Sequence, residues 1–243
     1  MTTLRFRAAV LPMVLLLLFG MSQTGCSAFN NTGKGAVAGA GAGAVIGGVI
    51  GRATGSTARG AIIGTAVGGA AGAIIGRQMD RQAREIENDL PDDVTVVSGD
   101  TDGDGNTDAI AIRFDNDLLF DRGQATLRSG VRADLRDLAA SLSRYPEYDL
   151  TIVGHASTDG PTDFNQRLSE NRASAVRSFL AQNGVGGTRM QDFGRGETEP
   201  LPGIAGQDPL NRRVEIAIYA SPELRRNMED PAYQEQYQRQ YGL

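Results

Sequence analysis

Residues 154–173 read GHASTDGPTDFNQRLSENRA and decide the fold. The stretch predicts the end of a strand, a Gly/Pro loop and the first turns of a helix. The spacing places Asn165, Leu168 and Arg172 on one helical face, so that the arginine can reach back toward the loop. A planar guanidinium there suits bidentate recognition of a carboxylate. A surface helix with a merely solvated arginine is the alternative interpretation.

Apolar segments on either side of this stretch alternate between strand and helix patterns. Strands are predicted at 94–97, 109–114, 149–153, 190–193 and 214–219, and helices at 129–144 and 163–183. From residue 109 onward the order is β-α-β-α-β-β, which predicts an α+β fold, a two-layer sandwich with its helices on one face of the sheet.

Three motifs in this region resemble the OmpA-like peptidoglycan-binding domain. They are the run Leu-Phe-Asp at 119–121, the run 165–173 with Gly-His eleven residues upstream of Asn165, and Asn-Arg-Arg-Val-Glu-Ile at 211–216. The resemblance covers residues 107–220. It implies a domain at 94–220 that binds the diaminopimelate of the peptidoglycan stem peptide.

The resemblance also implies a binding site. In that family an aspartate two residues after Gly-His and the arginine of Ser-x-x-Arg hold the ligand. In register, Arg172 fills the arginine role, whereas Ser157 occupies the aspartate position. Either Asp159, in the same loop, substitutes for that aspartate, or the Ser157 hydroxyl gives a weaker contact.

Further positions match those that shape the family's pocket, namely Asn165, Arg212 and Arg213. An arginine before a final strand can equally brace a loop, which leaves the role of Arg212 open. The implied peptidoglycan-binding residues are Ser157, Asp159, Asn165, Arg172 and Arg213.

The amino terminus predicts export. Residues 1–25 carry two arginines and an apolar core too short to span a membrane, as in a signal peptide. The only cysteine, Cys26, lies where it resembles a bacterial lipobox, although Gln23 replaces the usual aliphatic residue. This implies a palmitate-bearing lipid anchor, a lipidated linker at 26–32 and an outer-membrane lipoprotein whose C-terminal domain lies in the periplasm. A secretory signal with a free thiol is the alternative.

Residues 33–77 carry glycine at every fourth position in two runs, 35–51 and 60–76. Such glycines let helices approach closely within a membrane, whereas each would cost about 1 kcal/mol in a soluble helix. The block resembles the glycine-zipper hairpin of envelope lipoproteins, and we predict a helical hairpin in the outer-membrane lipid. A flexible linker is the alternative, and a homo-oligomer could form through the same grooves. The charged segment 78–93 predicts a helical stalk.

Two remaining segments lack a core pattern. Residues 221–243 predict a tail that is disordered or loosely helical. Between the first two strands, a loop resembles a calcium-binding loop because acids surround Gly105, namely Asp100, Asp102, Asp104 and Asp108. The closing glutamate is missing, so a polar hairpin turn is favoured over weak calcium binding. No other metal site and no cofactor is predicted.

The composition excludes some functions. The net charge is −5 and the segment after residue 84 is the acidic part, so no nucleic-acid partner is predicted. His155 is the sole histidine, and no catalytic triad or glutamate pair stands out, so no enzyme activity is predicted. The favoured function is a non-catalytic tether between the outer membrane and peptidoglycan. The alternatives are an envelope assembly or stress factor that uses wall binding only to position the hairpin, and a wall hydrolase.

Overall fold

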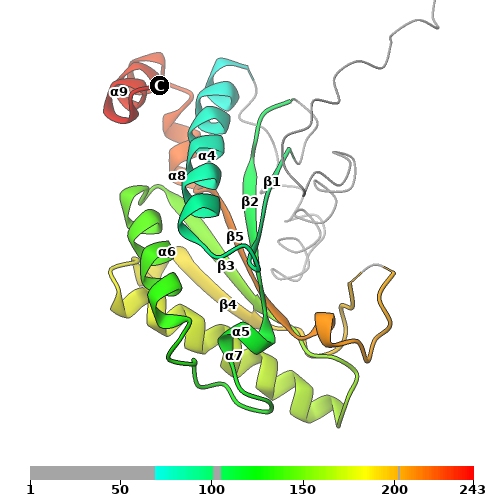
Figure 1. The fold of residues 1–243 in the computed structure, drawn as a ribbon. Helices are drawn as coiled ribbons and strands as arrows, with labels where there is room; N and C mark the ends of the chain where they lie inside the picture. The colour runs from blue at the N-terminus through cyan, green and yellow to red at the C-terminus, as the bar shows by residue number, and fades with distance from the viewer. Residues whose placement is uncertain (1–68, 101–104, 202) are drawn as a thin grey trace, which may run out of the picture. The chain divides into compact units, whose positions relative to one another are not determined.

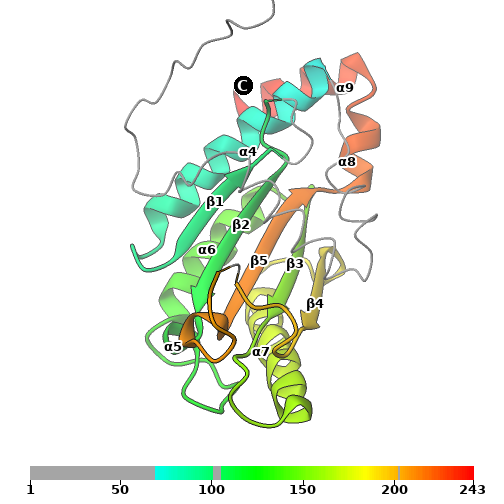
Figure 2. The same cartoon turned by 90° about the vertical axis from the view of Figure 1, so that its right-hand side faces the viewer.

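A computed structural model of the chain describes residues 69–100, 105–201 and 203–243. These residues form a five-stranded mixed sheet in the order β1-β2-β5-β3-β4 (Figures 1 and 2). The strands are β1 (Thr95–Gly99), β2 (Ala109–Asp115), β3 (Tyr148–Gly154), β4 (Met190–Gly194) and β5 (Arg213–Ala220). β3 and β4 run parallel, whereas the other neighbouring strands run antiparallel.

The helices pack against one face of this sheet. In Figure 2 the longer helices α4, α6 and α7 lie behind the strands. The helices of the described residues are α4 (Ala70–Asp89), α5 (Asn116–Leu119), α6 (Arg132–Arg144), α7 (Thr162–Gln182), α8 (Pro222–Asn227) and α9 (Pro231–Tyr241), with short 3-10 turns at Gly187–Arg189 and Pro209–Asn211. The predicted two-layer α+β sandwich is confirmed.

The core lies between the sheet and these helices. Alternate side chains of the central strands point into it, as the period of two requires. The register pairs Ile112 with Ile216 and Ile152 with Ile216, so three isoleucines from adjacent strands stack on the helix side. The apolar stripe of α6, including Leu135 and Leu142, is fully buried against them.

Helix α4 is part of the domain core, which differs from the prediction. We expected residues 33–77 to form a membrane hairpin and 78–93 to form a stalk. Instead one helix starts at Ala70, and its residues Ile74, Ile75 and Met79 are buried in the domain core. A Cβ on Gly76 would lie 2.9 Å from the Asn106 Cβ, so this glycine of the repeat allows the β1–β2 loop to approach. The assignment of residues 70–77 to the membrane was wrong. The sequence pattern of an apolar helix face is the same whether that face contacts lipid or a protein core.

For residues 221–243, the prediction of a disordered tail was also wrong, and the helical alternative holds. Residues 222–227 and 231–241 form α8 and α9, which pack on the domain. The Tyr148 and Tyr237 hydroxyls lie 3.0 Å apart, and the Tyr241 hydroxyl donates to Glu147 at 2.7 Å. The Tyr237 and Tyr241 rings are 4.6 Å apart. The tail therefore docks through tyrosines that join an apolar ring to a hydrogen-bonding hydroxyl, a pattern that a search for aliphatic periodicity overlooks.

Several predicted features lie outside the described residues. These are the signal peptide, Cys26, and the glycine-repeat segment up to residue 68. Of the calcium-loop acids, Asp102 and Asp104 lie outside as well. Within the described part, the Asp100 Oδ2 accepts a hydrogen bond of 2.8 Å from the Gly105 N–H, as in a turn. Among the described helices, none combines the length and apolar character needed to cross a membrane.

Two glycines set the distance between α7 and the sheet. Gly154 ends β3 and Gly194 ends β4, and these residues pair in the parallel register. A Cβ on Gly154 would overlap the Ser169 carbonyl oxygen, and a Cβ on Gly194 would overlap the Glu170 backbone nitrogen. The backbone of α7 therefore lies directly on these two strand ends.

We predict that Gly154→Ala destabilises the domain by about 2 kcal/mol or more, because the backbone of α7 must move away from β3. Chemical denaturation monitored by circular dichroism measures this change. Gly130→Ala is the control, since a Cβ there would meet nothing within 4 Å. Equal stability of the two variants would contradict the close approach.

Candidate functional site

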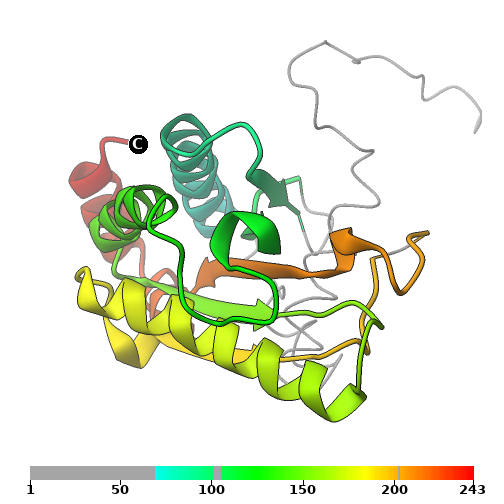
Figure 3. The ribbon, with the colours of Figure 1, turned by 60° about the horizontal axis from the view of Figure 1, so that its bottom comes forward.

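A cleft of about 580 Å³ lies at the end of the sheet where β3 runs into α7. In Figure 3 this end comes forward, with α5 and the first turns of α7 beside it. The cleft is lined by Asn116, Asp117, Arg122, Gly123, Ala156, Ser157, Asp159, Gly160, Pro161, Phe164, Asn165, Leu168, Arg172 and Arg212. Of the five binding residues predicted from the sequence, four lie here, namely Ser157, Asp159, Asn165 and Arg172.

Asn165 holds the loop that precedes α7. Its Nδ2 donates to the backbone carbonyls of Ser157 at 3.0 Å and Asp159 at 3.3 Å, and to the Glu197 Oε2 at 2.6 Å. The Thr158 N–H donates to the Gly206 carbonyl at 2.9 Å, which ties the loop to the segment before β5. Asn165 thus acts as a brace for the loop, and the loop forms one wall of the cleft.

Arg172 projects from α7 into the cleft, with only 1% of the residue exposed. Its Nε donates to the Gln124 carbonyl at 2.9 Å, and its guanidinium lies 5.3 Å from the centroid of the Phe120 ring. Within the described part of the chain, the buried Nη1 has no hydrogen-bond partner. A buried and partly unpaired guanidinium is costly, which makes this nitrogen a ready donor to an anion in the cleft.

Other charges of the cleft act on Arg172. Burial and then the neighbouring Arg212 cation lower the pKa of Arg172 to about 10, whereas Asp117 acts in the opposite direction. Arg172 therefore stays protonated at neutral pH. The Arg212 Nη1 lies 3.6 Å from the Asp159 Oδ2. The Asp159 Oδ2 also accepts a hydrogen bond of 3.3 Å from the Ser157 hydroxyl.

Arg213, the fifth predicted residue, is placed differently. It is buried beside β3 and its Nε lies 2.6 Å from the Glu215 Oε1, while its Nη1 donates to the Asn211 carbonyl. It is absent from the cleft lining, because its side chain lies on the same face of β5 as Glu215. The His155 ring is buried next to the same carboxylate, with its Nε2 3.7 Å from the Glu215 Oε2.

Residues 119–210 match the OmpA family. The chain contains an OmpA family domain. Residues 6–80 match the YMGG-like Gly-zipper family, which agrees with the glycine repeat seen in the sequence. The matched OmpA range includes Arg172 and the loop before α7, and it ends just before Arg212.

Relatives with curated names resemble this OmpA family domain over part of their length. Outer membrane porin F of Pseudomonas fluorescens is 31% identical over 117 residues, which cover 47% of this chain and 36% of the relative. The peptidoglycan-associated lipoprotein of Agrobacterium fabrum is 33% identical over 97 residues, 40% of this chain and 55% of the relative. "Probable lipoprotein YiaD" of Escherichia coli is 34% identical over 113 residues, 46% of this chain and 52% of the relative. The matched region thus spans about half, or less, of these relatives.

A solved structure supports the fold. A MotB-like protein from Desulfovibrio vulgaris shares 20% sequence identity and superposes with a TM-score of 0.51, covering 61% of this chain and 97% of that one. At this identity the likeness concerns the fold alone.

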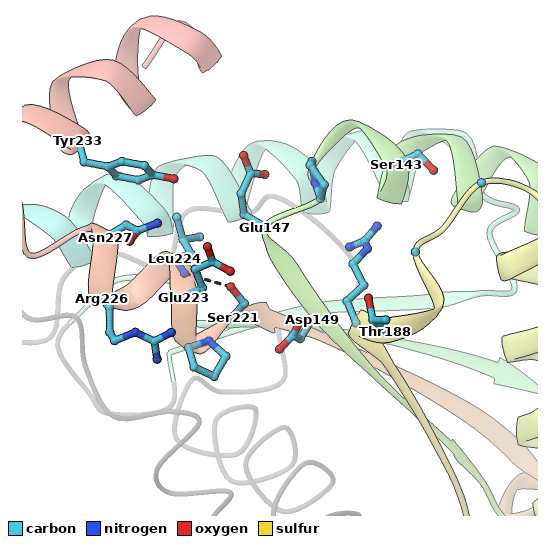
Figure 4. Close-up of a pocket in the computed structure, with 15 residues that line it drawn as sticks. Ser143, Glu147, Asp149, Thr188, Ser221, Glu223, Leu224, Arg226, Asn227 and Tyr233 are labelled. Atoms are coloured by element: carbon cyan, nitrogen blue, oxygen red, sulfur yellow. Dashed lines mark hydrogen bonds between the residues drawn. The ribbon is translucent and has the colours of Figure 1, made fainter.

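The OmpA family domain has a larger groove at the other end of β3 (Figure 4). The groove has a volume of about 750 Å³ and lies between α8, Glu147, Asp149 and the loop before β4. The arginine of this groove, Arg189, is only partly buried and differs from Arg172. The Arg189 guanidinium donates to the carbonyls of Leu142 at 2.6 Å, Tyr145 at 3.3 Å and Tyr148 at 2.6 Å. These bonds brace the end of α6, so the cleft at Arg172 is the better candidate site for an anion.

Several residues of the cleft were missed or left open by the sequence, among them Asp117, Arg122, Phe164 and Arg212. Arg212 was left open. It is an extended residue directly before β5, so the alternation of side chains could have placed it on the opposite side from Arg213. Phe164 was missed, although it is 45% exposed and lines the cleft. Within the described residues, no group of three His, Cys, Asp or Glu side chains could hold a metal ion.

We predict that stability falls on acidification through the buried Glu215 carboxylate. Burial alone would raise the pKa of Glu215, but the His155 ring and the Arg213 guanidinium hold it below its usual value of 4.5. Because the pKa of Glu215 is lower in the folded than in the unfolded protein, its ionised carboxylate stabilises the fold above pH 4.5. This stabilisation is lost as the pH falls below 4.5 toward the pKa of the folded state. Denaturant midpoints measured between pH 6 and pH 3 should fall for the wild type. The fall should be shallower for Glu215→Gln, and parallel curves would contradict the assignment.

Proposed function

We propose that the OmpA family domain binds peptidoglycan and that Arg172 grips a carboxylate of the stem peptide. The observation that carries this is the buried guanidinium, whose Nη1 has no partner within the described residues and which lines the cleft. Support comes from a relative named a peptidoglycan-associated lipoprotein, which is 33% identical over the matched region. The ligand group that the sequence resemblance implies is diaminopimelate, an amino acid with a carboxylate at each end.

The chemistry of the cleft fits this ligand. A carboxylate that enters the cleft can accept charge-assisted hydrogen bonds from the guanidinium edge, which contribute about 1.5–3 kcal/mol. The Gln124 carbonyl and the Phe120 ring hold the guanidinium in place before binding, so little side-chain freedom is lost. Asn165 keeps the loop in shape and contributes to binding indirectly.

We further propose that the chain tethers this domain to the outer membrane. Cys26 would carry the lipid anchor, and the glycine repeat before residue 69 would form the membrane hairpin. Support comes from the YMGG-like Gly-zipper match over residues 6–80. The role is non-catalytic. In support, His155 is buried beside Glu215 and is absent from the cleft lining.

Sedimentation with purified sacculi tests wall binding by the full chain. Arg172→Ala should weaken binding at least about tenfold, the loss expected for a charge-assisted contact. Arg172→Lys should weaken it less, because it keeps the charge but loses the planar fork. Arg167→Ala, which changes an exposed residue of the same helix, is the control and should bind like the wild type.

The same experiment separates the other functions. Unchanged binding by Arg172→Ala would refute the proposed site, provided that thermal unfolding shows the variant to be folded. Sacculus binding that fails altogether would favour an assembly role for the envelope protein. Release of soluble muropeptides would indicate a wall hydrolase.

Membrane retention tests the hairpin separately from the lipid. In a Cys26→Ser background, we predict that the protein stays with membranes after a carbonate wash. Adding Gly43→Leu and Gly64→Leu should release it, because leucine fills the grooves through which small residues pack. A matched control carries Ala42→Leu and Ala61→Leu, which leave the glycine period intact. Equal retention of all three proteins would count against glycine-dependent insertion.

A further inference from the structure

The Arg172 Nη1 has no hydrogen-bond partner among the described residues and can donate to an anion, whereas the carboxylates of Asp117 and Asp159 already have partners in the protein. We infer that it recognises the carboxylate of a diaminopimelate whose neighbouring amine is acylated, as in a peptide cross-link, in preference to one with a free ammonium group. This inference rests on the proposed function, since it refines which form of the stem peptide the same site takes. It follows from the charges that surround Arg172.

The first observation is the residue two positions after His155. Ser157 is buried, with 2% of the residue exposed, and its hydroxyl donates to the Asp159 Oδ2 at 3.3 Å. A neutral hydroxyl cannot form an ion pair with an ammonium group. The position therefore supplies no negative charge to the floor of the cleft.

The second observation concerns Asp159, the acid nearest in sequence. Its carboxylate has two partners, the Ser157 hydroxyl and the Arg212 Nη1 at 3.6 Å. Its side chain is 52% exposed, so it lies toward the mouth of the cleft and water already solvates it. A ligand ammonium would have to compete with Arg212 for this carboxylate and would gain little in exchange.

The third observation is the balance of charge. Three arginines line the cleft, namely Arg122, Arg172 and Arg212, against two acids, Asp117 and Asp159. The Asp117 carboxylate is exposed, and its Oδ1 accepts a hydrogen bond of 3.4 Å from the Asn116 Nδ2. The attraction of Asp117 for Arg172 is weaker than the repulsion by Arg212. The lining of described residues is thus net positive around the anion-binding nitrogen.

A ligand feels this balance through its own charges. A free ammonium two bonds from the bound carboxylate would lie within a few ångströms of the Arg172 cation, where like charges repel. Acylation converts the ammonium into a neutral amide, which removes the repulsion and leaves the carboxylate unchanged. The amide N–H and C=O can still bond to backbone groups of the loop.

Two synthetic probes test the inference. Both are the tripeptide L-Ala-γ-D-Glu-meso-diaminopimelate with every carboxyl group amidated except the one beside the side-chain amine. That amine is free in one probe and acetylated in the other. Isothermal titration calorimetry with the full-length protein in detergent should show tighter binding of the acetylated peptide, by about fivefold. Equal affinity, or tighter binding of the free amine, would overturn the inference.

Variants that restore a negative charge should reverse the preference. Ser157→Asp places an acid in the cleft that Arg172 also lines, and Arg212→Ala frees the Asp159 carboxylate from its ion pair without adding bulk. Each should shift the affinity ratio toward the free amine by at least about fivefold. Arg167→Ala should leave the ratio unchanged. If Asp117→Asn, rather than these two variants, controls the ratio, Asp117 is the ammonium partner and the inference is wrong.

These results remain distinct from failure of the proposed function. If Arg172→Ala binds both peptides as well as the wild type, the site itself is wrong. If Arg172→Ala loses both peptides while the wild type prefers the free amine, only the inference about acylation is wrong.

Discussion

The contact of α7 with the ends of β3 and β4 is the constraint from which the site follows. Gly154 and Gly194 lack side chains, so the helix backbone rests on the strands themselves. This fixes the height of α7 above the sheet. Asn165 and Arg172 lie on the side of the helix that faces the loop and the cleft, and their reach depends on that height. The Ser169 hydroxyl donates to the Gln166 carbonyl of α7 and accepts from the Gly196 N–H, so it also ties α7 to the segment after β4.

Electrostatics then give the site its character. The Arg172 guanidinium is withdrawn from water, supported on one edge by the Gln124 carbonyl and on one face by Phe120. Nearby, Arg213 is also buried, but Glu215 neutralises it at 2.6 Å. Two buried arginines of the same domain therefore have opposite roles. Arg213 forms its ion pair within the protein, whereas Arg172, which lines the cleft, keeps one nitrogen without a hydrogen-bond partner among the described residues.

The sequence predicted the sheet and the two central helices, because hydrophobic period and turn chemistry are local signals. It also proposed five binding residues, of which four line the cleft. It failed where a local pattern has two physical meanings. Ile74, Ile75 and Met79 look alike whether they face lipid or a core, and only the packing of α4 on the domain decides between them. The tail docks through Tyr237 and Tyr241, whose hydroxyl partners Tyr148 and Glu147 are distant in sequence. The assignment of Arg213 needed the direction of β5 side chains, which only the pairing register fixes.

The position of α4 has a mechanical consequence. The helix enters the domain at Ala70, and its last turn leads to Pro91, Asp93 and Val94, which lie beside Asp117 of the cleft. A load applied between the chain upstream of Gly69 and a ligand in the cleft would run along the whole length of α4. The load would then act parallel to α4 and shear it against β1, so the side-chain contacts between the two would bear the load together. A load perpendicular to the helix would instead break these contacts one after another.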